Sequence, residues 1–142
     1  MIERTLVLIK PDGVSRGLIG EIIKRIENKG LKIIGLKMMY FNRKLAEDFY
    51  YMHRNKPFFE DLISHITSGP VVAIVVEGNF AITTIRRMVG ATSPHEAAPG
   101  TIRGDYGLNI TLNVVHASDN VENSLREIKL LFENNEIISN TR

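Results

Sequence analysis

The sequence contains no cysteine, which excludes disulfides, thiolate zinc sites and cysteine nucleophiles together. It also lacks long apolar runs: the longest, such as residues 71–76, fall well short of the roughly 20 residues that a membrane-spanning helix needs. The first residues carry neither a basic segment nor a small-residue cleavage site, so we expect no export and no membrane association. These absences favour a protein of the reducing cytoplasm.

Neither sign of charge dominates the chain. Eighteen Lys and Arg against sixteen Asp and Glu leave a formal net charge of +2, with a pI of about 9.0. So small an excess argues against a DNA-wrapping or membrane-coating role but permits a local basic cleft for phosphates. The length of 142 residues, with 44% hydrophobic and 24% charged residues, is typical of one globular domain, which we assign to residues 1–142.

Hydrophobic periodicity predicts strands alternating with helices. Short apolar or alternating runs place strands at residues 6–9, 31–41, 71–76 and 110–114. The run 71–76 does not alternate, which indicates burial on both faces. Helical spacing predicts helices at residues 18–26, 44–51, 58–68, 82–90 and 121–132. This βαββαβ order with extra helices predicts an α+β fold with a four-stranded, mostly antiparallel sheet.

Turn and capping residues suggest where these elements begin and end. Residues 10–13 have the chemistry of a turn, Pro57 suits the first position of a helix, and Asn79 suits an N-cap. Asp119 with Glu122 three residues later has the spacing of a capping box for the last helix. Residues 90–107 are rich in proline and glycine with little periodicity, and a loop of this length is more often functional than idle.

Without cysteine, the histidines are the first candidates for a reactive group. His65 lies within a helical pattern and is expected to be structural, and His95 sits in the long loop beside Glu96. His116 differs, because it closes an apolar strand just before the last helix. A lone histidine is weak evidence, but Glu127, in the middle of that helix, is placed to orient an imidazole and raise its basicity.

Several cationic and polar residues suit a triphosphate. Planar guanidinium groups bind phosphate with two hydrogen bonds, and hydroxyl and imidazole groups add further contacts. The candidates are Lys10, His53, Arg86, Thr92 and Arg103. The chain contains neither a Walker A motif nor G-x-G-x-x-G, so we expect side chains rather than a backbone cradle to bind phosphate.

Five segments, in order and spacing, resemble the nucleoside diphosphate kinases, and the similarity extends from about residue 3 to residue 132. They are IKPDGV at 9–14, PFF at 57–59, SGPVV at 68–72, PGTIRGD at 99–105 and NVVHASD at 113–119. Any one of these motifs is moderate evidence, whereas the ordered set is highly specific.

The resemblance implies a ferredoxin-like fold and transfer of the γ-phosphate from a nucleoside triphosphate to a different nucleoside diphosphate, with Mg²⁺. It implies that His116 is the nucleophile that becomes phosphohistidine and that Glu127 and Ser118 orient it. The positions that match phosphate-binding residues are His53, Arg86, Thr92 and Arg103. Those matched to the sugar and the active histidine are Lys10, Tyr50 and Asn113, with Lys10 also near the transferred group.

By the same resemblance, Phe58 stacks on the base and Asp119 contacts Mg²⁺ through water. The loop 90–107 corresponds to an oligomer-contact loop, which implies a homo-oligomer, a hexamer built from dimers. Two positions depart from the common pattern: Ala117 stands where many members have glycine, and Leu112 where many have a basic residue. Neither departure removes a catalytic group.

Two other function classes remain as alternatives. A ferredoxin-like domain can bind nucleotides without catalysis, although the retained Lys10, Arg86, Arg103, His116 and Glu127 argue against that interpretation. A nucleic-acid-binding domain is suggested only by the pI, while the basic residues are dispersed and the aromatic pattern of RNA-binding sheets is missing. We therefore expect no specific nucleic-acid partner.

One relation between candidates is a problem for a regular strand. Asn113 and His116 are three residues apart, and successive side chains of a strand alternate between its two faces. If both residues line one site, the strand must end or bulge between them.

Overall fold

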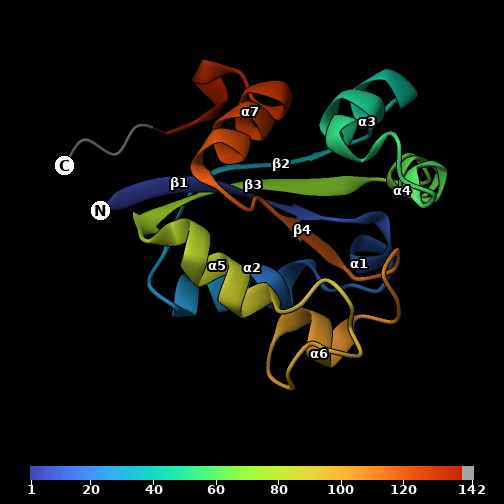
Figure 1. The fold of residues 1–142 in the computed structure, drawn as a ribbon. Helices are drawn as coiled ribbons and strands as arrows, with labels where there is room; N and C mark the ends of the chain where they lie inside the picture. The colour runs from blue at the N-terminus through green and yellow to red at the C-terminus, as the bar shows by residue number, and fades with distance from the viewer. Residues whose placement is uncertain (139–142) are drawn as a thin grey trace.

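The computed structural model describes residues 1–138 and contains one antiparallel sheet with helices on both faces (Figure 1). The strands are β1 (Ile2–Ile9), β2 (Lys32–Met39), β3 (Val71–Asn79) and β4 (Val115–Ala117), in the spatial order β2-β3-β1-β4. This arrangement confirms the predicted four-stranded α+β fold. Residues 139–142 of the assigned domain lie outside the described part of the chain.

The helices divide between the two faces of the sheet (Figure 1). On one face lie α3 (Arg43–Phe49), the 3₁₀ turn η1 (Tyr51–His53), α4 (Phe59–Ile66) and α7 (Val121–Leu131), followed by the short η2 (Asn134–Glu136). On the other lie α2 (Ile19–Asn28), α5 (Ala81–Val89) and α6 (Ile102–Tyr106), while α1 (Pro11–Ser15) follows β1 directly. None of the helices within residues 1–138 is long and apolar enough to cross a membrane.

The two central strands are buried on both faces. Along β1, Leu6 and Leu8 belong to the core beneath α3, α4 and α7, whereas Val7 and Ile9 belong to the core beneath α2 and α5. Along β3, alternate residues from 71 to 76 divide between the same two cores. Because both faces need apolar side chains, the sequence of β3 is continuously hydrophobic.

The fourth strand differs from its prediction. Residues 110–114 are irregular, and β4 contains only Val115–Ala117. Val114 has a positive φ of 75°, which interrupts an extended chain at that residue. The alternation of Ile110, Leu112 and Val114 therefore does not mark a strand, but the predicted break between Asn113 and His116 is confirmed.

Several predicted helix boundaries are also wrong. Residues 11–15 form the short helix α1 with Pro11 in its first turn, rather than only a turn. Pro57 precedes the N-cap Phe58, so it is not the first residue of α4. Asn79 ends β3 instead of capping α5, and its side chain accepts a hydrogen bond from the N-terminal amine of Met1.

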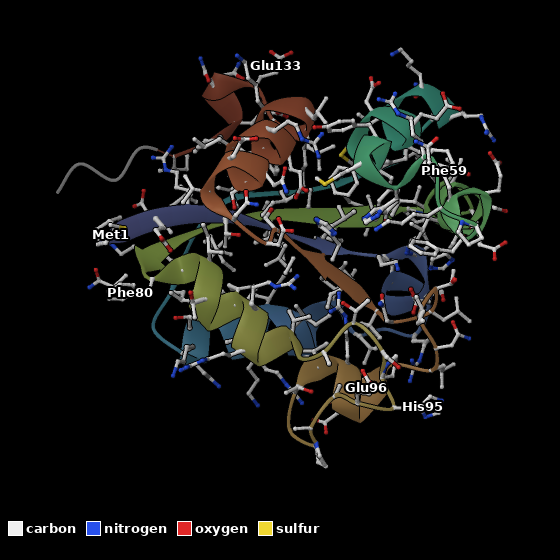
Figure 2. All side chains as sticks on the ribbon, in the orientation of Figure 1. Met1, Phe59, Phe80, His95, Glu96 and Glu133 are labelled. Carbon is white, nitrogen blue, oxygen red and sulfur yellow. The ribbon has the colours of Figure 1, made fainter. Side chains whose placement is uncertain are left out.

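The residue that precedes α5 is Phe80, in a left-handed conformation with φ 50°. Its backbone N–H donates to the carbonyl of Met1, and Figure 2 shows the two residues at the same end of the sheet. Figure 2 also labels His95 and Glu96, both exposed, on the segment between α5 and α6. The predicted irregular loop 90–107 thus includes one short helix, α6.

Candidate functional site

A pocket of about 240 Å³ brings together residues from segments spread between residue 10 and residue 127. Eleven of the twelve residues singled out from the sequence line it: Lys10, Tyr50, His53, Phe58, Arg86, Thr92, Arg103, Asn113, His116, Asp119 and Glu127. The twelfth, Ser118, lies behind the pocket wall and is hydrogen-bonded to Glu127. The fold therefore gathers side chains that are more than 100 residues apart in sequence.

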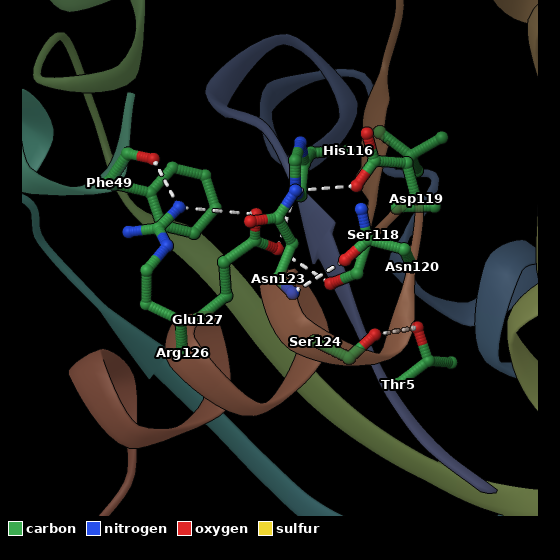
Figure 3. A network of polar contacts seen from close by, with 12 residues as sticks. Thr5, Phe49, His116, Ser118, Asp119, Asn120, Asn123, Ser124, Arg126 and Glu127 are labelled. Carbon is green, nitrogen blue, oxygen red and sulfur yellow. Dashed lines mark hydrogen bonds and ion pairs between the residues drawn. The ribbon is translucent and has the colours of Figure 1, made fainter. Parts of the chain in front are cut away.

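His116 is the central residue of β4, and its side chain is directed by the strand register. It pairs with Leu8 of β1, so it faces the same side of the sheet as Leu8, toward α3 and α7. Its ring packs against Phe49 in an edge-on contact, with ring centroids 4.8 Å apart and planes inclined by 65°. Its Nε2 lies 2.8 Å from Oε1 of Glu127 (Figure 3). The imidazole is thus oriented by both a ring contact and a hydrogen bond.

Glu127 is a buried carboxylate in the middle of α7. The same oxygen that contacts His116 accepts a hydrogen bond of 2.6 Å from the Ser118 hydroxyl (Figure 3). Burial alone would raise the pKa of Glu127, but the charge and hydrogen bond of His116 and the hydroxyl of Ser118 lower it below its usual value. Glu127 is therefore ionised and available to stabilise a protonated Nε2.

Lys10 is a buried cation at the end of β1, with its side chain inside the pocket wall. Its Nζ donates to Oδ1 of Asn113 at 2.9 Å and to the carbonyl of Thr111 at 2.8 Å. Burial lowers the pKa of Lys10 to about 8, opposed in part by the charge of Asp12. Both hydrogen-bond partners are neutral groups, so the ammonium charge retains the capacity to attract an anion.

Two arginines contribute further positive charge. Arg103 is buried in α6 and donates to the carbonyls of Val115 at 2.8 Å and Gly90 at 3.1 Å. Burial, followed by the charge of Arg86, lowers the pKa of Arg103 to about 10. Arg86 on α5 donates to the carbonyl of Ala117 at 3.2 Å. The Nε of Arg103 has no hydrogen-bond partner among the described residues, so part of its guanidinium group has unused donor capacity.

The aromatic and polar part of the pocket comes mainly from the α3–α4 connection. The rings of His53 and Phe58 lie 5.7 Å apart, and the buried ring of Tyr50 lies 6.2 Å from His53. Burial, then the charges of Lys56 and His116, lower the pKa of His53, and burial, then the charge of Glu127, raises that of Tyr50. Thr92 receives a hydrogen bond on its backbone carbonyl from Asn113 at 3.1 Å.

Asp119 does not form the predicted capping box. The N-cap of α7 is Asn120, and the Asp119 carboxylate instead accepts a hydrogen bond of 2.7 Å from the side chain of Asn123. That hydrogen bond lowers the pKa of Asp119, so the group is ionised. Within residues 1–138 no cluster of three or more His, Cys, Asp or Glu side chains could enclose a metal ion. A single carboxylate suits only a cation that takes its other ligands from water and phosphate, as Mg²⁺ does.

Three residues of this region were not singled out from the sequence. The sequence pattern around Phe49 indicates an ordinary core residue of α3, yet its ring packs on the ring of His116. Arg126 donates to the carbonyls of Asp48 and Phe49, at 3.1 and 3.2 Å, and so ties the end of α3 to α7. Ile110, which the alternation places in a strand, instead lies in an irregular segment, lines the pocket and is half exposed. No sequence signal distinguishes these residues from ordinary core or surface positions.

Comparison with known proteins gives consistent results. The model of the family described as nucleoside diphosphate kinase matches residues 3–137. The chain is 59% identical over 138 residues to a nucleoside diphosphate kinase of Archaeoglobus fulgidus, covering 97% of this chain and 91% of that protein. It is 61% identical over 136 residues to one of Staphylothermus marinus, covering 96% of each.

The structure also superposes closely on solved structures of nucleoside diphosphate kinases. A halophilic nucleoside diphosphate kinase from Halobacterium salinarum, solved in complex with CDP, superposes with a TM-score of 0.95 and 49% identity, covering 100% of this chain and 95% of that one. The enzyme of Aquifex aeolicus superposes with a TM-score of 0.94 and 40% identity, covering 97% of this chain and all of that one.

Proposed function

Since the chain belongs to the nucleoside diphosphate kinase family and is an enzyme of that kind, we propose that it transfers the γ-phosphate in two steps through His116. In the first step an imidazole nitrogen forms a bond to the γ-phosphorus, and the bond from that phosphorus to the bridging oxygen breaks. The nucleoside diphosphate leaves with the electron pair. In the second step a terminal oxygen of another nucleoside diphosphate attacks the same phosphorus, and the imidazole is released.

The observation that carries this proposal is the hydrogen bond between His116 Nε2 and Glu127. An ionised carboxylate can only accept a hydrogen bond, so its contact with Nε2 favours the tautomer in which Nε2 carries the proton and donates the hydrogen bond to Glu127. Nδ1 then holds the lone pair and is the nucleophile that we propose. As Nδ1 bonds to phosphorus the ring becomes more positive, and the buried Glu127, which Ser118 keeps in place, stabilises that charge.

The cationic side chains neutralise the negative charge on the transferred phosphoryl group. Phosphoryl transfer depends mainly on positioning and on neutralising charge spread over the equatorial oxygens. We assign that work to Lys10, Arg86 and Arg103, with His53, Thr92, Tyr50 and Asn113 as further nucleotide contacts. All of them line the same pocket as His116.

We propose Mg²⁺ as the cofactor, with Asp119 as a ligand acting through water. The ion, when bound, neutralises phosphate charge and helps to align the phosphates. Asp119 fits this role because it is an ionised carboxylate on the pocket wall whose nearest partner is the neutral amide of Asn123.

The pocket suits nucleotides with any base. Phe58 places an aromatic ring on the pocket wall, and stacking on an aromatic ring is worth about 1–3 kcal/mol per base and depends little on the base. We therefore propose that the substrates are nucleoside di- and triphosphates in general. The relative from Halobacterium salinarum was solved with CDP, which supports a nucleoside diphosphate as ligand.

The proposal also covers the domain organisation, the cellular location and the oligomeric state. We assign residues 1–142 to one domain, we expect the enzyme to work in the cytoplasm, where its nucleotide substrates are used, and we expect a hexamer built from dimers. A nucleic-acid-binding role has no support from the family match, and steep salt dependence of DNA or RNA affinity would be needed to revive it.

The decisive experiment follows the phosphoryl group. ATP labelled in its γ-phosphate should label the protein without any acceptor, because the first step needs no second substrate, and the label should be acid-labile and alkali-stable. Adding GDP, UDP or CDP should discharge it as the matching triphosphate, and steady-state plots should show the parallel lines of a ping-pong mechanism.

Variants identify the nucleophile. The His116→Ala variant should lose both labelling and exchange, whereas His95→Ala, an exposed loop histidine, should keep both. Exchange without any labelled protein would show direct transfer between two bound nucleotides. Labelling that survives in His116→Ala would point to another nucleophile, with His53 the next to test.

A further inference from the structure

Val114, which lies between Asn113 and His116, adopts a backbone conformation that its side chain disfavours. Its φ is 75°, and a β-branched residue rarely occupies the left-handed region. The kink has a clear consequence. In a regular strand Asn113 and His116 would face opposite sides of the sheet, but here both line the same pocket.

Residues 10–13, which follow β1, hold this kink through hydrogen bonds to both the carbonyl and the N–H of Val114. The backbone N–H of Lys10 donates to the Val114 carbonyl at 2.8 Å, and the Val114 N–H donates to Oδ2 of Asp12 at 3.1 Å. Gly13 packs so closely that a Cβ there would lie 3.0 Å from the Val114 carbonyl oxygen. The Asp12 carboxylate is therefore the side chain that satisfies the amide of the strained residue.

The second oxygen of Asp12 is held from another part of the fold. His65 on α4 places its Nε2 2.9 Å from Asp12 Oδ1, and the two side chains are only 13% and 10% exposed. Neither residue lines the pocket that contains His116. The pair thus forms a chain of contacts from α4 through Asp12 to the backbone of residue 114.

We propose that Asp12 and His65 are positioning residues that hold the Val114 kink and thereby keep Asn113 and His116 on the same side of the sheet, in one pocket. His65 fixes the Asp12 carboxylate, which in turn fixes the Val114 amide two residues before the nucleophile. The proposal rests on the proposed role of His116, and it assigns a function to a histidine that the two-step reaction itself does not use.

The pKa of Asp12 supports the role given to its carboxylate. Burial alone would raise the pKa of Asp12, but the hydrogen bond and charge of His65, then the charge of Lys10, lower it. Asp12 is therefore an ionised acceptor, and hydrogen bonds to an ionised group are stronger than those between neutral groups.

The test compares matched variants in the full-length protein. His65→Phe keeps a ring but removes the donor, whereas His65→Gln keeps a donor that reaches Asp12. Asp12→Ala removes the central carboxylate. Glu77→Ala is the control, because Glu77 is a half-buried carboxylate that pairs with Arg4 at 2.9 Å and lies away from the pocket of His116.

Three measurements separate positioning from general destabilisation. Hydrogen–deuterium exchange of a peptide that begins before residue 112 and ends near residue 117 reports the Val114 amide, since the first two residues of a peptide do not retain the label. Single-turnover labelling of His116 at saturating ATP reports the chemical step, and calorimetry reports ADP affinity. We expect faster exchange at Val114 and about tenfold to a hundredfold slower labelling in His65→Phe and Asp12→Ala, the range expected for a misplaced reacting group, with ADP affinity little changed.

We expect His65→Gln to restore most of the amide protection and most of the labelling rate, and Glu77→Ala to match the wild type. The proposal is overturned if His65→Phe and His65→Gln behave alike, or if both match Glu77→Ala. If Asp12→Ala does not fold, the two His65 variants decide. If the wild type is never labelled, the proposed function fails, but the exchange of the Val114 amide still shows whether Asp12 and His65 hold the kink.

Discussion

Lys10 shows how a single residue can be prepared for phosphate. Its ammonium group is buried and hydrogen-bonded to a carbonyl and an amide, while the nearby Asp12 is occupied by His65 and the Val114 amide. Because both hydrogen-bond partners of the ammonium group are neutral, its charge in this desolvated place attracts an anion more strongly than it would in water. Burial also makes the protonated amine less favourable, which lowers the pKa of Lys10 to about 8.

The Lys10 pKa predicts a pH dependence for the free enzyme. Activity that needs the protonated amine should fall as pH rises through about 8, because the charge is then lost. The measurement is kcat/KM for ATP between pH 6 and 10, since this ratio reports ionisations of the free enzyme.

The contribution of Lys10 to stability has the opposite sign. Its pKa in the folded state lies below the ordinary value of 10.5, so the unfolded chain binds the proton more tightly. The free energy of unfolding due to this group therefore rises with pH between about 8 and 10.5. A Lys10→Met variant should lose both pH effects. A kcat/KM profile that stays flat through pH 8 in the wild type would contradict the role given to Lys10.

Arg103 and Lys10 are expected to be much more important for activity than an exposed cation. Arg103→Ala and Lys10→Ala each remove a charge from the pocket, and losing one donor that stabilises developing charge typically costs about 2.7–4 kcal/mol, or a hundredfold to a thousandfold in rate. Lys129→Ala, on the exposed side of α7, should be near wild type. Equal rates for the three variants in a nucleotide-exchange assay would show that the site is misplaced.

At the level of elements, α7 supports the site beyond the contact of Glu127 with His116. Arg126, the residue before Glu127, donates to the carbonyl of Phe49 at the end of α3 (Figure 3). It also donates to the carbonyl of Asp48 and lies over the ring of Tyr51 at 4.7 Å. The carbonyls at a helix C-terminus lack partners within the helix, and a cation there is favourable. Arg126 thus joins α7 to the segment that carries Phe49, Tyr50 and His53.

Truncating this arginine should loosen that connection. We expect Arg126→Ala to lower the free energy of unfolding by about 1–2 kcal/mol, because two hydrogen bonds from a charged group and one cation–π contact are lost at a partly exposed site. Lys129→Ala on the same helix is the control. Denaturant unfolding provides the measurement, and equal midpoints for the two variants would refute the role given to Arg126.

At the level of the whole molecule, several surfaces favour association. The edge strand β2 leaves Leu36 and Met38 half exposed or more, and Tyr40 just after it is more exposed still. The loop 90–107 is held against α2, where Arg25 pairs with Asp105 at 2.9 Å and donates to the Gly100 carbonyl at 3.1 Å. Exposed apolar patches on an open sheet edge and an ordered projecting loop are typical of interfaces.

We therefore expect a closed homo-oligomer, a hexamer built from dimers, as the resemblance implies. Closed point-group symmetry is the usual outcome for soluble assemblies of identical chains. Light scattering at micromolar concentration measures the mass. A monomeric mass would refute this expectation, whereas a tetramer would correct the assembly and leave the proposed chemistry unchanged.

The local sequence was sufficient for most of the fold. Continuous apolar residues at 71–76 predicted a strand buried on both faces, and the two cores confirm it. The helical spacing of Ile22 and Ile26 likewise predicted α2. These patterns reflect which side chains leave water, a property that the order of residues alone determines. Residue chemistry and the resemblance to a family together selected the twelve candidate residues, eleven of which line one pocket.

Only the tertiary structure decided how the ends of elements and the site are built. Residues 110–114 alternate like a strand, but contacts from Lys10 and Asp12, about 100 positions earlier, hold Val114 in a kink instead. Asp119 has the spacing of a cap, but Asn120 takes that position. The sequence places Glu127 in the helix that follows His116, but its burial and its hydrogen bond to His116 arise only because α7 packs over the sheet, chiefly against β1. Contacts between distant segments leave no local pattern, so packing alone determines them.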